Sequence, residues 1–279
     1  MNPIAFWKMS GSGNDFVMID VREKPLVLRD IPLAEFISKI CRRGLSVGAD
    51  GVILIERSAI ADYKWHYYNA DGGEVAMCGN GSRCVARFAF LNKIAPAKHT
   101  IETVAGIIHA EVLGEDGHRV RVQLTDPNDL RLNLKIEIGG VVNEGHFVNT
   151  GVPHVVYFMD DVEQVSLLPI GRATRRHSLF APAGTNANFV QIVRRDLIKI
   201  RTYERGVEDE TLACGTGSVA AAVIGAALGK LASPISVETR SGIMLGVDFK
   251  QSVTHFSEVH LEGDASIIYK GELSEEALL

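Results

Sequence analysis

Short segments of strand-forming residues make up most of this chain. In several of them apolar and polar residues alternate, as in half-buried antiparallel strands, because successive side chains of a strand point to opposite faces. The pattern predicts strands at residues 17–19, 52–55, 65–68, 107–112, 120–124, 154–158, 189–193, 198–203 and 243–249. The chain is therefore expected to consist mainly of β-sheet.

Two longer segments differ from this pattern. Residues 79–92 and 215–230 each begin with glycine and continue with closely spaced small and apolar residues, mainly alanine and valine. Such a composition predicts two helices that are buried on all sides. Two further helices, at residues 33–43 and 162–177, are expected at the surface.

The two buried helices begin with almost the same sequence. Cys78 opens Cys-Gly-Asn-Gly-Ser and Cys214 opens Cys-Gly-Thr-Gly-Ser, and the offset from 78 to 214 is 136 residues, nearly half of the chain. The same offset pairs Gly48 with Gly184, Tyr67 with Tyr203, Glu74 with Glu210 and Ala86 with Ala222, and a slip of two residues pairs Gly13 with Gly151. Several matches in one register indicate an internal duplication. We therefore expect two similar lobes, each with strands around a central helix, and a boundary at residues 125–128, where Asp-Pro-Asn interrupts the strand pattern.

The composition is that of a globular protein. Of the 279 residues, 46% are hydrophobic and 23% are charged, and the net charge is −5. Without a dense run of Lys and Arg, the chain is not expected to bind nucleic acid or a membrane surface. No apolar stretch has the roughly 18–20 residues that cross a bilayer, and the N-terminus lacks a secretory signal pattern, so we expect a cytoplasmic location. Four cysteines are too few for a secreted disulfide scaffold.

Cys78 and Cys214 each stand where a predicted helix begins, and the glycines that follow let the backbone approach a ligand closely. A helix N-terminus carries roughly half a positive charge. It lowers the pKa of a neighbouring thiol and binds an anion such as a carboxylate. Each half of the chain is thus expected to offer a reactive thiol beside an anion site.

A pseudo-twofold relation between the lobes would direct both helix N-termini into one interlobe cleft. Inversion of a carbon centre needs a base on one face and an acid on the other. One thiolate would remove the α-proton of a bound amino acid, and the other thiol would protonate the opposite face. Negative charge that develops on the substrate carboxylate would then face two helix N-termini.

Other roles for the cysteines are disfavoured. A single buried cysteine is usually a small core residue, and Cys41 and Cys84, which lie outside the repeat, are expected to be structural. A zinc site does not fit, because no Cys-x-x-Cys occurs and the nine histidines form no ligand-spaced cluster. A phosphate-binding loop would need a Gly-Lys-Ser/Thr ending, which the chain lacks.

Six motifs carry a resemblance to a known family. They are Gly-Ser-Gly-Asn-Asp-Phe at 11–16, Asn-Ala-Asp-Gly at 69–72, Met-Cys-Gly-Asn-Gly-Ser-Arg-Cys at 77–84, Gly-Thr-Asn at 184–186, Tyr-Glu-Arg-Gly at 203–206 and Ala-Cys-Gly-Thr-Gly at 213–217. In these motifs, and essentially from end to end, the chain resembles the diaminopimelate epimerases. This family comprises pyridoxal-phosphate-independent, two-cysteine epimerases of lysine and cell-wall biosynthesis.

The resemblance implies a role for each matching residue. Cys78 and Cys214 would be the acid–base pair, with no cofactor and no metal. The α-carboxylate would be held by the backbone N–H groups of Gly79, Asn80, Gly215 and Thr216. The residues implied to recognise the distal end of the substrate are Asn14, Asn69, Asn186, Glu204 and Arg205. These types suit the second carboxylate and ammonium of diaminopimelate, because arginine binds carboxylates bidentately and amide or glutamate oxygens accept from ammonium groups.

Three of these positions also have simpler explanations. Arg205 alone would usually be a surface salt-bridge residue, and Asn14 and Asn186, beside glycines, would stabilise turns. His154 is either a binding residue or a buried, hydrogen-bonded histidine.

One position departs from the family, which usually has Gly-Asn-Pro-His where this chain has Gly-Val-Pro-His at 151–154. Val152 cannot form a side-chain hydrogen bond, and Asn149 is the candidate to replace the missing asparagine.

The fold class that the resemblance implies is α/β of the α+β type. It has two pseudo-symmetric lobes, each an antiparallel β-barrel-like sheet around a central helix. The last strand, at residues 265–273, would return to the first lobe. The N-terminal lobe, with Cys78, would then comprise residues 1–125 and 265–279, and the C-terminal lobe, with Cys214, residues 126–264. The family also implies a homodimer.

The expected reaction is the epimerisation of LL-2,6-diaminopimelate, a small-molecule substrate, to the meso form. A first alternative is a racemase of another polar amino acid, such as histidine. Asn69, Asn186 and Arg205 disfavour it, whereas Val152 keeps it open. A second alternative is a non-catalytic amino-acid-binding or redox-sensing protein, in which the two cysteines form a reversible disulfide. An isomerase of the phenazine-biosynthesis type lacks the cysteine pair and is disfavoured.

Overall fold

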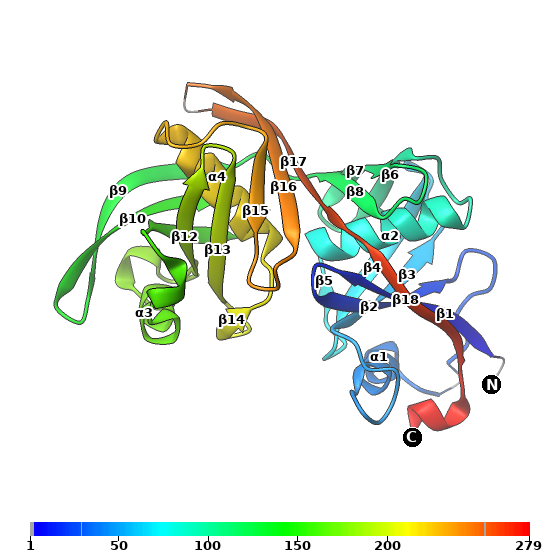
Figure 1. Cartoon of the computed structure of the whole chain (residues 1–279). Coiled ribbons are helices and arrows are strands. Elements are labelled where there is room, and N and C mark those ends of the chain that lie inside the picture. Colours follow the sequence, from blue (N-terminus) through cyan, green and yellow to red (C-terminus); the bar gives the residue numbers. More distant parts are fainter. Residues whose placement is uncertain (1–2, 29, 254) are drawn as a thin grey trace. The chain divides into compact units, whose positions relative to one another are not determined.

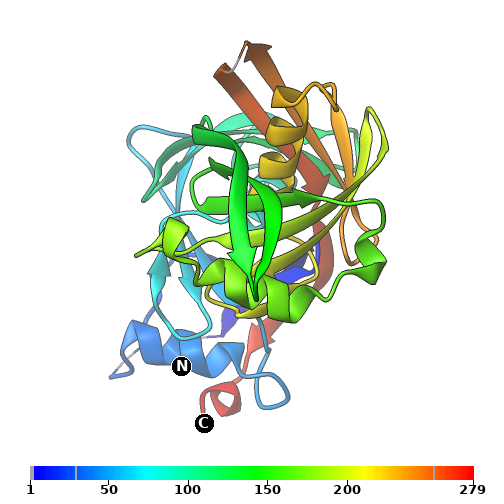
Figure 2. The same cartoon turned by 90° about the vertical axis from the view of Figure 1, so that its left-hand side faces the viewer.

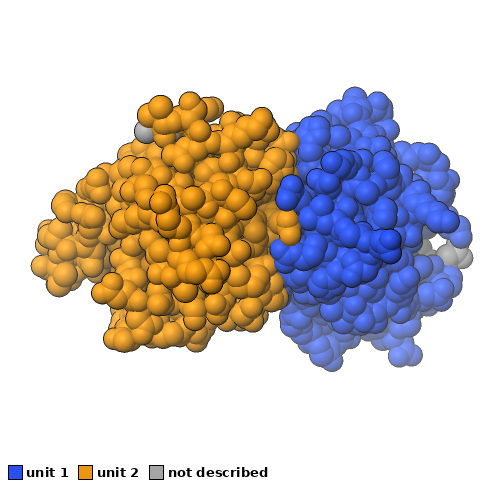
Figure 3. All heavy atoms as spheres, turned by 45° about the horizontal axis from the view of Figure 1, so that its top comes forward, with its two compact units in different colours: residues 1–122, 263–279 blue, residues 123–262 orange. Residues whose placement is uncertain are grey.

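The computed structural model describes residues 3–28, 30–253 and 255–279 (Figure 1). The chain folds into two compact units, coloured separately in Figure 3. Unit 1 consists of Met1–Val122 and Gly263–Leu279, and unit 2 consists of Gln123–Glu262. Unit 1 is therefore built from two separate stretches of sequence, whereas unit 2 is continuous.

Unit 1 contains one sheet whose strands follow the order β18-β1-β2-β3-β4-β6-β7-β8, with the short β5 paired to β4. The strands are β1 (Ile4–Gly11), β2 (Asn14–Asp20), β3 (Gly51–Glu56), β4 (Tyr63–Asn69), β5 (Glu74–Val75), β6 (Lys98–Thr103), β7 (Gly106–Leu113), β8 (Arg119–Gln123) and β18 (Ser266–Leu273). As the sequence predicts, the last strand returns to the first, and Leu273 lies opposite Ile4 in an antiparallel pair.

Unit 2 repeats this arrangement with the order β9-β10-β11-β12-β13-β15-β16-β17, and β14 pairs with β13. The strands are β9 (Asn128–Ile138), β10 (Val141–Asn149), β11 (Pro153–Phe158), β12 (Asn186–Arg194), β13 (Leu197–Glu204), β14 (Asp209–Thr211), β15 (Ile235–Glu238), β16 (Met244–Ser252) and β17 (His255–Asp264). Each strand and each pairing has its counterpart in unit 1. The predicted duplication is therefore visible in the topology.

The sheets are not purely antiparallel. In unit 1, β2 pairs in parallel with β3 and β4 with β6, and in unit 2 the parallel pairs are β11 with β12 and β13 with β15. A helix lies between the two strands of each parallel pair along the chain. A helical crossover returns the chain to the same end of the sheet, so the next strand runs in the same direction. The resemblance implied antiparallel sheets, and the structure corrects this prediction, because each sheet contains two parallel strand pairs.

The two predicted buried helices are confirmed as α2 (Gly79–Leu91) and α4 (Gly215–Ala227) (Figure 1, Figure 2). Helix α2 contacts β1, β2, β3 and β7, and α4 contacts the corresponding strands β10, β11, β12 and β16. All residues from Gly217 to Ala226 are buried. Strands from both halves of each sheet therefore reach the central helix, as a barrel-like wrap requires.

The outer face of each sheet is covered by a shorter helix, α1 (Leu33–Cys41) in unit 1 and α3 (Leu167–Arg175) in unit 2. In β3, Val52 and Leu54 pack in the cluster with α1, whereas Ile53 on the opposite face lies against Gly81 of α2. Both faces of this strand are buried, which explains its continuous apolar sequence.

The helix bounds differ from the prediction where local chemistry intervenes. Helix α4 ends before residue 230 because Gly229 adopts φ 70° and Lys230 N donates to Gly225 O, as in a glycine-terminated helix. Helix α3 begins only at Leu167, because Pro169 is tolerated in the first helical turn. A short 3₁₀ turn, η1 (Val162–Gln164), precedes it. None of the described helices is long and apolar enough to cross a membrane.

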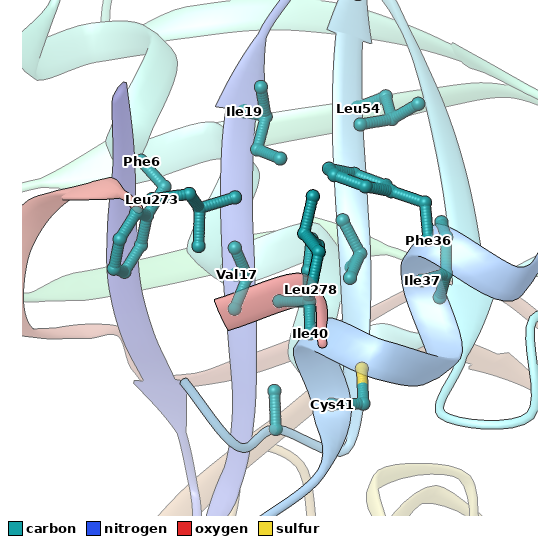
Figure 4. Packing of buried hydrophobic residues seen from close by; sticks show 12 residues of the cluster. Phe6, Val17, Ile19, Phe36, Ile37, Ile40, Cys41, Leu54, Leu273 and Leu278 are labelled. Carbon is teal, nitrogen blue, oxygen red and sulfur yellow. The ribbon is translucent and has the colours of Figure 1, made fainter. Parts of the chain in front are cut away.

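The C-terminal turn η3 (Glu275–Leu278) completes the outer core of unit 1. Leu273 and Leu278 join side chains from β1, β2, β3 and α1 in one buried cluster (Figure 4). The Ser46 hydroxyl donates to Ala277 O at 2.8 Å and holds the turn in place. The two ends of the unit 1 sequence are thus joined by packing as well as by the β1–β18 pair.

The Leu278→Ala variant should therefore be less stable than the wild type. Leu278 is 5% exposed, and removal of a buried leucine side chain costs about 2 kcal/mol or more of unfolding free energy. Urea denaturation measures this loss. Leu279→Ala is the matched control, because its side chain is 81% exposed and its loss should leave the midpoint nearly unchanged. Equal midpoints for the two variants would contradict the packing of η3.

Candidate active site

Cys78 is the N-cap of α2. Its backbone is extended, with φ −145° and ψ 116°, and its Sγ atom accepts a hydrogen bond from Gly81 N at 3.4 Å. The residue is partly exposed. Serine, threonine and aspartate usually fill this position, so a sulfur there replaces the oxygen that would cap the helix.

Cys214 occupies the same position in α4, with φ −123° and ψ 107°. Its Sγ atom lies 3.6 Å from Thr216 Oγ1. Ser82 in α2 and Ser218 in α4 each donate a hydroxyl hydrogen bond back to the N-cap carbonyl, at 2.9 Å in both helices. The duplicated motif therefore builds the same local structure twice.

The first turn of each helix leaves backbone donors for a ligand. The first N–H groups of a helix have no intrahelical acceptor, and here they belong to Gly79 and Asn80 in α2 and to Gly215 and Thr216 in α4. They lie beside the two sulfurs and carry the positive end of each helix dipole. This combination suits a carboxylate next to a thiolate.

Gly217 is required by close packing in the first turn of α4. A Cβ atom at this position would lie 2.4 Å from Asn188 Oδ1 and 3.2 Å from Cys214 Sγ. The amide of Asn188 cannot move aside, because Thr202 Oγ1 donates to its Oδ1 at 3.0 Å and its Nδ2 donates to Val155 O at 2.9 Å. The glycine thus lets α4 approach β12 closely.

A hydrogen-bond chain leads from the core of unit 2 to Cys214. Asn188 Nδ2 lies 3.1 Å from His154 Nδ1, and His154 Nε2 lies 3.0 Å from Thr216 Oγ1. Because the amide nitrogen can only donate, His154 Nδ1 accepts and the ring proton is on Nε2. Nε2 therefore donates to the Thr216 hydroxyl. The threonine proton is then available to the sulfur when Cys214 is a thiolate.

His154 is fully buried. Burial lowers its pKa to about 3, and the charge of Arg205 acts in the same direction. The imidazole is thus neutral at physiological pH and keeps the tautomer that its partners select. Of the two roles that the sequence left open for His154, the structure supports the buried, hydrogen-bonded one, in contact with the predicted site residue Thr216.

In unit 1, two predicted site residues contact each other. Asn80 Nδ2 donates to Asn14 Oδ1 at 2.6 Å, and Asn14 Nδ2 donates to Asp50 Oδ2 at 3.0 Å. Asn69, at the end of β4, is exposed, and its Oδ1 accepts from the hydroxyl of Tyr67 at 2.9 Å. Tyr67 itself is buried in the repeat position that matches Tyr203.

The remaining predicted residues of unit 2 lie around β12 and β13. Asn186 Oδ1 accepts from Arg205 N at 2.7 Å, and Asn186 Nδ2 lies 3.5 Å from His154 Nε2. Among the described residues, the guanidinium of Arg205 donates only to Ala183 O, at 3.0 Å through Nη1, and its other N–H groups remain for a ligand. Burial raises the pKa of Glu204.

The segment that departs from the family pattern forms a tight turn between β10 and β11. Gly151 N donates to Asn149 Oδ1 at 3.0 Å, and Thr150 Oγ1 donates to Thr216 O at 3.1 Å. The acceptor oxygen of Asn149 is thus used within the turn. This oxygen can accept one further hydrogen bond, and the amide nitrogen offers donors, so either end of the side chain suits a substrate contact.

Sequence reasoning did not single out four residues that hold these groups in place: Asp50, Arg83, Asn188 and Thr202. Arg83 lies inside the motif at 77–84, but arginines are usually exposed, and its complete burial could not be inferred from the motif. Asn188 follows Asn186 by two residues, so strand periodicity alone would place both on one face of β12. The other two cysteines, Cys41 and Cys84, are buried, and burial raises the pKa of both thiols, to about 11 for Cys41.

Comparison with known sequences gives one consistent result. The family model for diaminopimelate epimerase matches residues 6–130 and 146–265. The diaminopimelate epimerase of Aquifex aeolicus is 47% identical over 280 residues, which cover 98% of this chain and 99% of that protein. The diaminopimelate epimerase of Archaeoglobus fulgidus is 40% identical, with 97% and 96% covered.

Solved structures show the same fold at low identity. A PhzF-family phenazine biosynthesis protein from Bacillus anthracis has a TM-score of 0.73 and 16% identity, and the match covers 98% of this chain and 100% of that chain. A hydroxyproline epimerase from Agrobacterium vitis has a TM-score of 0.69 and 13% identity, with 98% and 93% covered. These matches confirm the predicted fold class.

The buried His154 should make stability depend on pH in acid. Between pH 6.5 and about 3 the unfolded chain binds a proton at this residue that the folded chain does not, so unfolding free energy falls as pH falls. In His154→Gln this slope should decrease by up to about 1.4 kcal/mol per pH unit. Urea denaturation at several pH values measures it.

The matched control is His255→Gln, which removes an exposed histidine of the same unit. If His154→Gln keeps the full wild-type slope, the imidazole is not held neutral in the folded protein.

Proposed function

Because the chain belongs to the diaminopimelate epimerase family, we propose that it interconverts LL-2,6-diaminopimelate and meso-diaminopimelate. The relatives of that name match nearly its whole length. The observation that carries the proposal is the presence of a cysteine at the N-cap of each duplicated central helix. The reaction belongs to lysine and peptidoglycan-precursor biosynthesis.

In the proposed mechanism one thiolate removes the α-proton and becomes a thiol. The other thiol delivers its proton to the opposite face of the same carbon and becomes a thiolate. No electrons are gained or lost, and the enzyme returns to its starting state when the reverse reaction follows or when the two thiols exchange protons with solvent. The proposal requires that Cys78 and Cys214 act on one bound substrate.

The local geometry supports an acid–base role for each sulfur. Cys78 Sγ receives the Gly81 N–H, and Cys214 Sγ lies beside the Thr216 hydroxyl, which His154 leaves free to donate. Hydrogen-bond donors and a helix N-terminus both favour the thiolate. The same helix ends would stabilise the negative charge that grows on the α-carboxylate as the carbon loses its proton.

For the distal end of the substrate we propose the shell of Asn14, Asn69, Asn186, Glu204 and Arg205. The guanidinium of Arg205 has donors left for a carboxylate after its bond to Ala183 O. The carboxylate of Glu204 offers hydrogen-bond acceptors, and the asparagine amides offer both donors and acceptors. A ligand without the distal groups would leave some of these side chains unpaired, so the shell would select against it.

We also propose a homodimeric assembly and a cytoplasmic location, which the family resemblance supports. Sedimentation equilibrium of the purified chain measures the first, and cell fractionation measures the second.

Replacement of either Cys78 or Cys214 by alanine should abolish epimerisation, with a loss of about 10³-fold or more, because one face of the carbon then lacks its acid or base. Proton NMR in deuterated water, started from the LL isomer, follows both loss of the α-proton signal and formation of the meso isomer. Cys41→Ala is the control, since that buried thiol belongs to the outer core of unit 1.

Three results would contradict the proposal. Near-normal turnover in either active-site variant would exclude the two-base mechanism. Exchange by the wild type with another amino acid, but not with diaminopimelate, would establish the racemase alternative. Absence of exchange with every amino acid tested would favour a binding or redox-sensing protein.

Arg205→Ala should raise KM for diaminopimelate by about tenfold or more, because a charge-assisted hydrogen bond to the distal carboxylate is lost. The rate of α-proton exchange at saturating substrate should change much less, since Arg205 does not touch the reacting carbon in this mechanism. Steady-state kinetics separates the two effects. Arg194→Ala, which removes an exposed arginine of the same unit, is the control, and equal KM values for both variants would exclude the distal role.

A further inference from the structure

The side-chain amide of Asn14 is held from both sides. Its Oδ1 accepts from Asn80 Nδ2 at 2.6 Å, and its Nδ2 donates to Asp50 Oδ2 at 3.0 Å. Asn80 Oδ1 in turn accepts from Arg83 Nη2 at 2.8 Å. Four side chains of unit 1 thus form one hydrogen-bond chain, which runs from Arg83 through Asn80 and Asn14 to Asp50.

The two ends of this chain determine the orientation of both amides. A guanidinium can only donate hydrogen bonds, and a carboxylate can only accept them. The two ends of an amide have nearly the same shape, but a flip of either asparagine would place an N–H against Arg83 or an oxygen against Asp50. One orientation of each amide therefore satisfies the whole chain.

Further contacts fix the Arg83 end. The side chain is fully buried, and its other donors reach Ser12 Oγ at 2.7 Å, Asp264 O at 3.2 Å and Gly79 O at 3.4 Å. The Ser12 hydroxyl donates to Asp264 Oδ1 at 2.7 Å. A buried charge needs such partners, so the guanidinium has one available position.

The Asp50 end is fixed as well. Arg43 Nη2 donates to Asp50 Oδ1 at 2.8 Å, and Asp15 N donates to Asp50 Oδ2 at 3.1 Å. Lys8 Nζ lies 2.8 Å from Asp15 Oδ2. Burial of Asp15 opposes its ionisation, but hydrogen bonds from Arg43 and Lys8 prevail and lower its pKa to about 2. Two cations thus hold the two carboxylates in place.

From this chain we infer that Asp50 and Arg83 are positioning residues that make Asn14 a hydrogen-bond donor to the substrate. The second Nδ2–H of Asn14 has no partner among the residues that the structure describes, and the side chain is half-buried at the start of β2. This N–H suits a carboxylate or carbonyl oxygen and disfavours an ammonium group. The inference rests on the proposed function, because it assigns to Asn14 an oxygen of the amino-acid substrate.

An exchange of the two side chains tests the inference. Asn14→Asp places two carboxylates side by side, so both stability and substrate affinity should fall. Asp50→Asn removes the acceptor that orients Asn14, and KM should rise severalfold. In the double variant Asn14→Asp/Asp50→Asn, the new carboxylate accepts from Asn80 and from the new amide, so the hydrogen bond between positions 14 and 50 and the net charge are restored. The bond from Asp15 N and the ion pair with Arg43, which need the carboxylate at position 50, are not restored.

The double variant should therefore have a higher urea midpoint than Asn14→Asp alone, while KM stays raised by about tenfold or more, because position 14 now offers only acceptors. Asp20→Asn is the matched control, since it makes the same charge change at the other end of β2, where the carboxylate binds Arg22. Its KM should equal that of the wild type.

If KM of the double variant returns to the wild-type value as the stability lost in Asn14→Asp is regained, the hydrogen-bond chain only supports the fold and the inference is wrong. It is also wrong if Asp50→Asn and the double variant both keep the wild-type KM while the wild type turns over diaminopimelate. A wild type that does not turn over diaminopimelate would instead refute the proposed function, so the two failures are distinct.

Discussion

Helix α4 has no polar side along residues 217–226, so it is stable in water only where strands cover it on every side. Helix α2 is nearly as buried, and strands from both halves of each sheet meet its central helix. Once a helix is enclosed in this way, its sides are unavailable to any ligand. The first turn remains, where backbone N–H groups lack helical acceptors. The constraint that forms each unit therefore also leaves its first helical turn as the proposed place of its chemistry.

The same constraint explains why the residues around each thiol are small or already paired. Gly217 lets α4 approach the Asn188 amide, and that amide orients His154, which orients Thr216 beside Cys214. In unit 1 the corresponding helix end is held by Arg83 and Asn80. Cys214 Sγ thus lies at the end of a polar network whose inner members, His154 and Asn188, are buried, and Cys78 Sγ lies at a helix end whose Arg83 and Asn80 side chains are buried and paired. Preorganisation of this kind is what acid–base chemistry at a weakly acidic carbon needs.

Much of the fold and of the candidate site could be predicted from the sequence, because the motifs that indicate them are local or occur twice. The glycine-led helices and the cysteine pair follow from motifs and from the 136-residue offset, and the return of the last strand follows from the family resemblance. The parallel strand pairs were missed, since strand direction depends on the path of the crossover and not on the composition of the strand. The roles of Arg83 and Asn188 were missed because burial of a polar residue depends on partners that are distant in sequence. The tautomer of His154 follows from two such partners, Asn188 and Thr216, and could not be predicted from one position.

Unit 1 is assembled from residues 1–122 and 263–279, whereas unit 2 is one continuous stretch. During synthesis on the ribosome, unit 2 therefore has all its strands before unit 1 does. Strand β1 lacks its neighbour β18, and the outer core lacks Leu273 and Leu278, until the final segment has been translated. The half of the protein that is made first is thus the half that is completed last, and its exposed strand edge and apolar face must remain unpaired for the time it takes to synthesise the whole of unit 2.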